Sequence, residues 1–187
     1  MILGAGTAGT MMSNHLVKAL PKEEYQISLV DERKVHHYQP GYLFIPFGTY
    51  TEKDVIKPIE KYLPKNVRYI QTRIEKVVPE KNQVLLSNGA TLNYHLLIVA
   101  TGSQIAPDEI EGMNGPAWRK NIFDFYTLDG ALALHKKLEN WRGGHLVVHI
   151  AEMPIKCPVA PLEFAFLADA FFREKRMRHK VKITYVT

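Results

Sequence analysis

The sequence predicts an α/β protein: a Rossmann-like dinucleotide-binding domain with a β-meander insert, followed by the start of a second Rossmann-like domain. Two observations carry this prediction. A glycine-rich turn at Gly4–Gly9 lies between a short apolar strand and a helix, and the order strand–helix–strand occurs twice, in residues 1–31 and 145–187. Such βαβ units pair their strands in parallel. We therefore expect two domains, at residues 1–106 and 107–187.

The composition is that of a globular protein, with 46% hydrophobic and 23% charged residues. The net charge of +5 comes from 24 Lys and Arg against 19 Asp and Glu. This excess suits an anionic cofactor but is too small to indicate nucleic acid, and the basic run Arg173–Lys182 has no interleaved aromatic residues. No apolar stretch approaches the roughly 20 residues that span a bilayer. Cys157 is the only cysteine, so no disulfide forms within the chain.

The chain is expected to be a fragment of a longer protein. Only Met1–Leu3 precede the first glycine, whereas a strand usually has about five residues. At the other end, Val181–Thr187 has the pattern of a strand with nothing after it.

The remaining elements follow from hydrophobic periodicity and turn residues. In the first half we expect a helix at Thr10–Leu20 that ends before Pro21, a buried strand at Gln26–Val30, a loop at Lys34–Tyr50, a helix at Lys53–Leu63, strands at Val67–Val78, Gln83–Ser87 and Thr91–Tyr94 around an Asn88-Gly89 hairpin turn, and a buried strand at Leu96–Ala100. In the second half we expect a linker at Pro107–Pro116, a helix at Thr127–Trp141, a strand at His145–Ile150, a helix at Pro158–Arg176 and a final strand at Val181–Thr187.

The glycine turn has the pattern G-x-G-x-x-G, which favours dinucleotide binding over an ordinary glycine-rich turn. Gly4 permits the tight turn, Gly6 lets the backbone approach a pyrophosphate, and Gly9 permits close packing of helix on strand. The following helix presents free N–H groups and a partial positive charge. Asp31 lies 22 residues after Gly9, where its carboxylate would accept hydrogen bonds from ribose hydroxyls. The motif alone does not distinguish NAD from FAD.

A cysteine stands where a second glycine motif would be expected. The strand at His145–Ile150 runs into Ala151–Pro158, which contains two prolines and no glycine. Side chains there would obstruct a pyrophosphate, and proline offers no N–H donor. We therefore expect that the second domain does not bind NAD(P)H in the usual way.

Cys157 is the candidate catalytic residue of this loop. It is predicted at the helix N-cap with Pro158 at the first helical position, where the helix dipole and Lys156 would favour a thiolate. Glu163, one to two turns into the helix, would relay protons. The alternatives are an inert cysteine in the core and an exposed glutamate without a catalytic role.

Four segments, in order, resemble those of the sulfide:quinone oxidoreductases. They are GAGTAG at Gly4–Gly9, HHYQPG at His36–Gly41, VATG at Val99–Gly102 and AEMPIKCPVAPLEFAFLADAFFREK at Ala151–Lys175. The Ala-Thr-Gly segment resembles a motif of flavoproteins with two dinucleotide-binding domains, the glutathione-reductase-like family, in which the first glycine motif binds FAD. The Cys-Pro segment is also similar to that of flavocytochrome c sulfide dehydrogenases.

This resemblance implies FAD as cofactor, sulfide as electron donor, a membrane quinone as acceptor, and peripheral attachment to a membrane surface through a part of the protein beyond this chain. It implies that Cys157 carries sulfur beside the flavin. The implied cofactor contacts are Gly4, Gly6, Thr7, Ala8, Gly9, Asp31, Glu32, Gln39, Pro40, Ala100, Thr101 and Gly102. Nucleic acid is not an expected partner, and self-association is left open. Members commonly use a second redox cysteine, which this chain lacks.

Two features of the loop after the second strand have ordinary explanations. His36 and His37 have no cysteine or carboxylate at metal-ligand spacing, so no metal site is expected. The aromatic residues line a flavin or quinone pocket, or they simply pack the loop; both interpretations stay open for Tyr38, Tyr42, Phe44 and Phe47.

Three other functions remain as alternatives. The first is the flavoprotein subunit of a sulfide dehydrogenase that passes electrons to a cytochrome. The second is an NADH:quinone reductase of the same fold, against which the missing second glycine motif argues. The third is a non-catalytic flavin-binding or interaction module in which Cys157 is structural.

Overall fold

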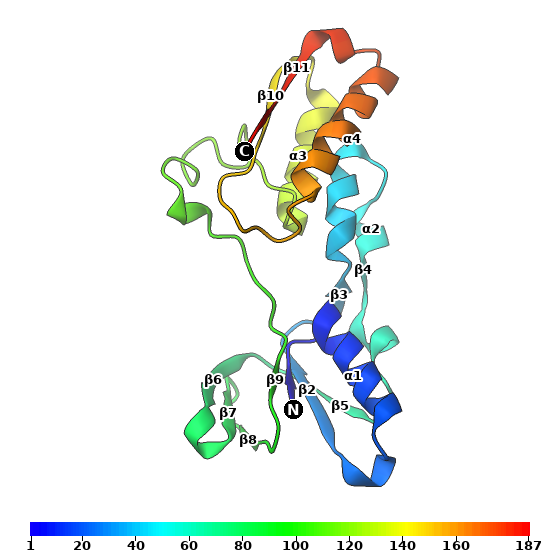
Figure 1. The fold of residues 1–187 in the computed structure, drawn as a ribbon, viewed down its shortest axis with the longest axis vertical. Helices are drawn as coiled ribbons and strands as arrows, with labels where there is room; N and C mark the ends of the chain where they lie inside the picture. Colours follow the sequence, from blue (N-terminus) through cyan, green and yellow to red (C-terminus); the bar gives the residue numbers. More distant parts are fainter. The chain divides into compact units, whose positions relative to one another are not determined.

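The computed structural model describes all 187 residues, which form two compact units (Figure 1). The first unit comprises Met1–Tyr38 and Ile56–Gln104, and the second comprises Gln39–Val55 and Ile105–Thr187. The sequence predicts a single division at 106/107, whereas contacts also assign Gln39–Val55 to the second unit. The segment belongs to the second unit because of apolar packing. Leu43 lies in the same buried cluster as residues of helices from the second half of the chain.

A four-stranded parallel sheet forms the centre of the first unit, as expected for a Rossmann-like domain. Its strand order is β5-β2-β1-β9, and helix α1 connects β1 to β2 (Figure 1). The bounds are β1 Ile2–Leu3, α1 Thr7–Ala19, β2 Ile27–Asp31, β5 Val67–Gln71 and β9 Ile98–Val99. Helix α1 ends where predicted, because Leu20 adopts an extended conformation ahead of Pro21. Apolar residues of the helix, Leu16 and Val17, pack on the buried sheet residues Ile2 and Leu29.

The predicted β-meander is present as an antiparallel sheet of β6 (Ile74–Val78), β7 (Gln83–Leu86) and β8 (Thr91–Asn93). Its buried residues Val84 and Leu86 form a core cluster with sheet residues Leu3 and Val30. The hairpin turns at Asn88-Gly89, where Gly89 has a φ of 83°, a conformation that glycine adopts without strain.

Two strand predictions need correction. The segment Val67–Val78 is not one strand, because the chain leaves the parallel sheet after Gln71 and enters the antiparallel meander at Ile74. The segment Leu96–Ala100 is not a buried strand either. Only Ile98–Val99 is extended, at the sheet edge beside β1, and the side chain of Val99 is 66% exposed.

The predicted helix at Lys53–Leu63 is wrong. Its place is taken by a four-residue helix α2 (Glu52–Val55), a strand β4 (Ile56–Pro58) and a 3-10 helix (Ile59–Tyr62). Pro58 explains the break, since proline lacks an N–H and disfavours the helical conformation at the residue before it.

The segment Lys34–Tyr50, predicted as a loop, contains regular structure. Strand β3 (Val35–His37) pairs antiparallel with β4, and a 3-10 helix, η2, covers Gln39–Phe47. The shorter 3-10 helices of the chain are Lys22–Glu24, Pro79–Lys81, Pro107–Glu109 and Arg178–Lys180.

The second unit contains the second βαβ pattern that the sequence predicts. Strands β10 (Gly144–His149) and β11 (Val181–Val186) pair in parallel, and helix α4 (Ala160–Glu174) connects them (Figure 1). Helix α3 (Leu128–Asn140) precedes β10. One buried cluster joins the helices, the strands and η2; it consists of Leu43, Leu134, Leu138, Val148, Phe164, Ala168, Phe172 and Val181. None of the helices combines the length and the apolar character needed to cross a bilayer.

Candidate functional site

The three glycines of the turn have different surroundings. A Cβ atom on Gly4 would lie 2.4 Å from the carbonyl oxygen of Ala100, and a Cβ on Gly9 would lie 1.8 Å from the carbonyl oxygen of Gly4. Gly4 also has a φ of 93°, which strains other residues. By contrast, a Cβ on Gly6 would meet nothing closer than Arg33 Nη2 at 3.8 Å. Two glycines thus allow close backbone packing, and the middle one leaves open space beside the turn.

The helix that follows the turn has an uncapped N-terminus. Helix α1 begins at Thr7, with Ala8 in its first turn and Gly6 at the N-cap. No side chain accepts a hydrogen bond from the first amides, and the first turn holds no acidic residue. Such an end leaves N–H donors and a partial positive charge for an anion. The turn and the helix therefore fit the pyrophosphate of a dinucleotide.

The Ala-Thr-Gly segment lies beside the glycine turn. The Ala100 N–H donates to Leu3 O at 2.7 Å, which places the segment at the carboxyl end of β1. Thr101 is exposed, and Gly102 has a φ of 77° with open space where a Cβ would project. The first unit therefore brings Gly4–Gly9 and Ala100 together although 90 residues separate them in the sequence.

Asp31 is at the end of β2, as predicted, but its carboxylate already has partners. The side chain is 6% exposed. Oδ2 accepts hydrogen bonds from the Ala5 N–H at 2.7 Å and from Arg33 Nη2 at 2.8 Å, while Oδ1 accepts from Arg33 Nε at 3.1 Å. Asp31 thereby couples the second strand to the glycine turn. Glu32 beside it is exposed.

Arg33 was missed by the sequence analysis, although a basic residue two positions after the strand-end acid is a usable signal. Burial alone would raise the pKa of Asp31, but the hydrogen bonds from Arg33 and Ala5 outweigh burial and hold that pKa below its ordinary value. The same pairing raises the pKa of Arg33. Burial, followed by the negative charge of Asp31, raises the pKa of Tyr69 to about 12. Its hydroxyl donates to the carbonyl oxygen of Arg33.

The cysteine loop of the second unit connects β10 to α4 without any glycine. The prediction that Cys157 is the N-cap and Pro158 the first helical residue is wrong. Helix α4 begins at Ala160, Val159 is its N-cap, and Pro161 lies in its first turn. Cys157 has a left-handed φ of 53°, which no helical residue adopts, so the helix starts later. The thiol-bearing residue is exposed, in contrast to the inert core cysteine considered as an alternative.

Two neighbours fix the backbone at Cys157. Its carbonyl oxygen accepts hydrogen bonds from the Ala160 N–H at 3.0 Å and from the Tyr126 hydroxyl at 3.3 Å. Tyr126 stacks on Phe125 with ring centroids 5.1 Å apart, and Phe125 stacks on Phe164 of α4 at 4.8 Å. Burial, followed by the charges of Cys157 and Tyr185, raises the pKa of Tyr126 to about 12. Tyr126 therefore remains a protonated donor at neutral pH; nothing local in the sequence marks this role.

Gln39, Pro40 and Glu163 also lie in the second unit. Gln39 accepts a hydrogen bond from Lys156 Nζ, so it lies beside the cysteine loop, and Pro40 is exposed next to it at the start of η2. Glu163 is exposed in the first turn of α4, where a negative charge stabilises the helix dipole. Its carboxylate has no partner, and its catalytic role stays a prediction.

The aromatic residues of η2 mostly pack within the second unit. Phe47 contacts Phe164 with ring centroids 5.0 Å apart, and Phe44 contacts Tyr50 at 5.3 Å. Tyr42 is buried. These three therefore match the interpretation of an ordinary packed segment, while Tyr38, in the first unit, is 51% exposed.

Comparison with known proteins finds similarity to two kinds of quinone oxidoreductase. The chain is 26% identical over 188 residues to the mitochondrial sulfide:quinone oxidoreductase of Mus musculus, covering 100% of this chain and 41% of that protein. It is 31% identical over 121 residues to the type II NADH:quinone oxidoreductase of Staphylococcus aureus, covering 64% of this chain and 30% of the relative. The chain thus spans about two-fifths or less of these relatives.

The same fold occurs in a solved structure. The sulfide:quinone oxidoreductase of Aquifex aeolicus superposes with a TM-score of 0.80 at 22% identity, covering 98% of this chain and 42% of that one. This likeness confirms the predicted α/β fold class.

A family profile described as pyridine nucleotide-disulphide oxidoreductase matches residues 1–149 of the 187. Members of this family are FAD-binding flavoproteins, so the expected cofactor, FAD, is confirmed. The open Gly6, the uncapped start of α1 and the adjacent Ala100 agree with that cofactor. This chain belongs to the pyridine nucleotide-disulphide oxidoreductase family.

Proposed function

We propose that the protein to which this chain belongs is an FAD-dependent sulfide:quinone oxidoreductase in which Cys157 carries sulfur. The observation that carries the proposal is the exposed Cys157 in a glycine-free connection between β10 and α4. A nucleotide loop at this position needs glycines for close backbone approach and N–H donors for phosphate. The match to the mouse sulfide:quinone oxidoreductase along the whole chain supports the same proposal.

Residues of the first unit would hold the cofactor. Gly6 and the first amides of α1 would receive the pyrophosphate, and the Asp31–Arg33 pair would face the adenosine side of it. FAD, when bound, supplies two-electron acceptor and donor chemistry. The remaining contacts implied by the resemblance stay proposals: Thr7, Ala8, Glu32, Gln39, Pro40, Thr101 and Gly102.

Residues of the second unit would bind sulfide and react with it. A Cys157 thiolate is a strong nucleophile for sulfur chemistry, and its exposed position gives sulfide access. Tyr126 and Lys156 would position the loop through their hydrogen bonds to Cys157 O and to Gln39. Glu163 would exchange protons with solvent. In the proposed overall reaction, sulfide is oxidised by two electrons and a quinone is reduced to the quinol. Peripheral attachment to a membrane, where quinones reside, is part of this proposal.

Other functions of the same fold are weaker candidates. The similarity to a type II NADH:quinone oxidoreductase favours nicotinamide as the donor, but it covers 64% of the chain. The connection at residues 150–159 has no glycine through which NADH phosphates would be approached. A sulfide dehydrogenase subunit that passes electrons to a cytochrome would use a similar cysteine loop with a different electron acceptor.

The test is sulfide-dependent quinone reduction by the full-length, FAD-loaded protein and its Cys157→Ser variant. Loss of the nucleophile should lower turnover by roughly three orders of magnitude or more. FAD content should not change, because Cys157 and the glycine turn lie in different compact units. Met153→Ser is a matched control, since it changes another exposed side chain of the same loop. Full turnover by Cys157→Ser would refute the proposal.

A further inference from the structure

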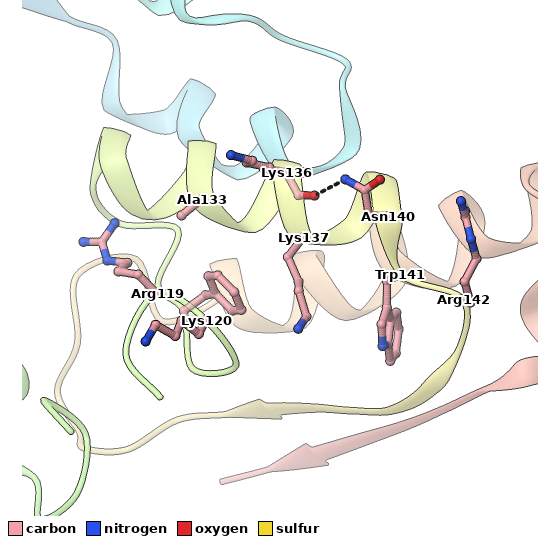
Figure 2. A pocket seen from close by; sticks show the side chains of 9 residues that line it. Arg119, Lys120, Ala133, Lys136, Lys137, Asn140, Trp141 and Arg142 are labelled. Carbon is pink, nitrogen blue, oxygen red and sulfur yellow. Dashed lines mark hydrogen bonds between the residues drawn. The ribbon is translucent and has the colours of Figure 1, made fainter. Parts of the chain in front are cut away.

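A second candidate site lies in the second unit, along helix α3 and the segment that leads to the start of β10. It is a hollow with a volume of about 460 Å³, within the range of ligand sites. One wall is the face of α3 near its C-terminus, including Lys136 and Lys137, and continues through Trp141 and Arg142 toward β10. The other wall is the loop before α3, with Arg119 and Lys120. We call this hollow the α3 pocket (Figure 2).

The charge of the α3 pocket is unusual. Five of its nine lining side chains are cationic and none is anionic. Two cations have local partners: Lys137 Nζ donates to Asn121 Oδ1 at 2.8 Å, and Arg119 pairs with Asp124 at 3.0 Å. The side-chain cations of Lys120, Lys136 and Arg142 have no hydrogen-bond or ion-pair partner, although the Lys136 carbonyl oxygen accepts a hydrogen bond from Asn140 Nδ2 at 3.1 Å. Figure 2 shows Lys120, Lys137 and Trp141 on one side of α3, Lys136 on the opposite side of the helix in this view, and Arg142 beyond its C-terminal end.

Stabilisation of the α3 dipole explains only part of this charge. Cations near a helix C-terminus interact favourably with the dipole, which accounts for Lys136, Lys137 and Arg142. Lys120 comes from the preceding loop, eight residues before the helix, so it is not one of the charges at the helix end itself. Lys120 and Lys137 line the same hollow, so a bound anion would be attracted by both charges.

The pocket also has a rigid aromatic surface. Trp141 packs edge-on against the fully buried Phe172, with ring centroids 5.4 Å apart. The same ring lies close to Gly144, where a Cβ would be 3.3 Å from it, a tight contact. Phe123 packs against the buried cluster of the unit. These rings are therefore held in place before any ligand arrives, which lowers the entropic cost of binding.

We propose that the α3 pocket binds a mononucleotide-sized ligand, a planar ring that carries phosphate groups. The phosphates would interact with Lys120 and Lys137, and the ring would lie against Trp141 and Phe123. A bare inorganic anion would leave the aromatic surface unused. This site is separate from the proposed sulfur chemistry at Cys157, so either proposal can fail without the other.

The test is calorimetric titration of the full-length, FAD-loaded protein with ADP, so that the glycine turn is already occupied. We expect saturable binding that weakens as salt is added. Adenosine, which lacks phosphate, and inorganic phosphate, which lacks the ring, should each bind at least about tenfold more weakly than ADP. The double variant Lys120→Ala/Lys137→Gln should lose binding by at least about tenfold, since it removes two charge-assisted contacts. Lys76→Ala, on the exposed meander, is the matched control and should bind ADP normally.

Three outcomes would overturn the proposal. They are the absence of saturable ADP binding, ADP binding that is unchanged in the double variant, and inorganic phosphate binding as tightly as ADP. Because Lys120 is exposed and Lys137 is half-buried, the double variant should unfold at the wild-type temperature. If it does not, Lys120→Glu alone serves as the second variant, with the same loss of ADP binding expected.

Discussion

The glycines of the turn make separable contributions at the scale of single residues. Gly9→Ala should prevent stable folding of the first unit, because the new Cβ would lie 1.8 Å from the Gly4 carbonyl oxygen. Gly6→Ala should fold with near wild-type stability, since its φ of −72° is ordinary and its Cβ meets nothing closer than 3.8 Å. It should nevertheless retain less FAD, because a methyl group would occupy the open approach to the backbone.

Thermal unfolding and flavin content, measured on the same full-length preparations, check this pair of variants. Gly89→Ala is a control for positive φ without crowding, since φ is 83° and nothing lies within 4 Å of a Cβ there. Its cost should be about 1 kcal/mol. A Gly6→Ala protein that keeps all its FAD would contradict the role assigned to the open glycine.

The Asp31–Arg33 pair predicts a pH dependence. The pKa of Asp31 is depressed in the folded state, so its contribution to stability is complete above the unfolded-state pKa of about 4 and is lost as the pH falls through the folded value. Asp31→Asn should therefore destabilise the protein by about 1 kcal/mol at pH 7. The figure is small because the Arg33 side chain is 41% exposed and solvent screens the pair.

Urea unfolding of wild type and Asp31→Asn from pH 7 to pH 3 measures this difference. The gap between the two stabilities should shrink as the pH decreases, because Asp31 then takes up a proton in the wild type. A gap that stays constant or widens would show that Asp31 does not stabilise the turn as a carboxylate.

At the residue scale, the sequence predicted most of the glycine turn but few of the long-range partners. The spacing of Gly4, Gly6 and Gly9 and the strand-end position of Asp31 are local patterns, and the structure has them. The hydrogen bond from Tyr126 to Cys157 joins positions 31 residues apart, so it depends on packing that no local pattern encodes.

At the scale of elements, the start of α3 depends on a buried polar cluster. Thr127 caps the helix by accepting from the Gly130 N–H at 3.0 Å, and Asp124 accepts from the Thr127 N–H at 2.8 Å. Thr127→Ala should cost about 1 kcal/mol, as for loss of an N-cap. Asp124→Ala should cost about 3 kcal/mol or more, because it also leaves Arg119 without its buried partner.

Chemical denaturation of the full-length variants tests this order. Asp129→Ala removes an exposed acid from the first turn of the same helix and should cost only a few tenths of a kcal/mol. Equal effects of Asp124→Ala and Asp129→Ala would contradict the role given to the buried ion pair.

Elements with a regular hydrophobic periodicity, or with a proline or glycine that marks their end, could be predicted from the sequence. Elements in segments without such patterns could not. Helix α1 and its end before Pro21, the meander turn at Gly89, and the parallel pair of β10 with β11 agree with the sequence. The helix expected at Lys53–Leu63 does not form, because Pro58 disfavours the helical conformation at the residue before it, and this outweighs the apolar periodicity of the segment. The start of α4 was misplaced since the left-handed backbone of Cys157 cannot be inferred from residue type.

At the scale of the whole molecule, the sequence predicted two α/β units but not which segments build them. Segment Gln39–Val55 belongs to the second unit because Leu43 and Phe47 pack on apolar residues of α3 and α4. Burial of each such side chain contributes about 1.5–3 kcal/mol, which outweighs proximity in sequence. Local sequence patterns do not predict contacts between residues that lie this far apart in the sequence.

We propose that sulfur chemistry at Cys157 takes the place of nicotinamide chemistry in the second unit. The most direct measurement is anaerobic reduction of the flavin in the full-length protein, followed by absorbance after rapid mixing with sulfide or with NADH. We predict fast bleaching with sulfide, its loss in Cys157→Ser, and no more than slow bleaching with NADH. Fast bleaching by NADH alone, with sulfide inert, would contradict the claim.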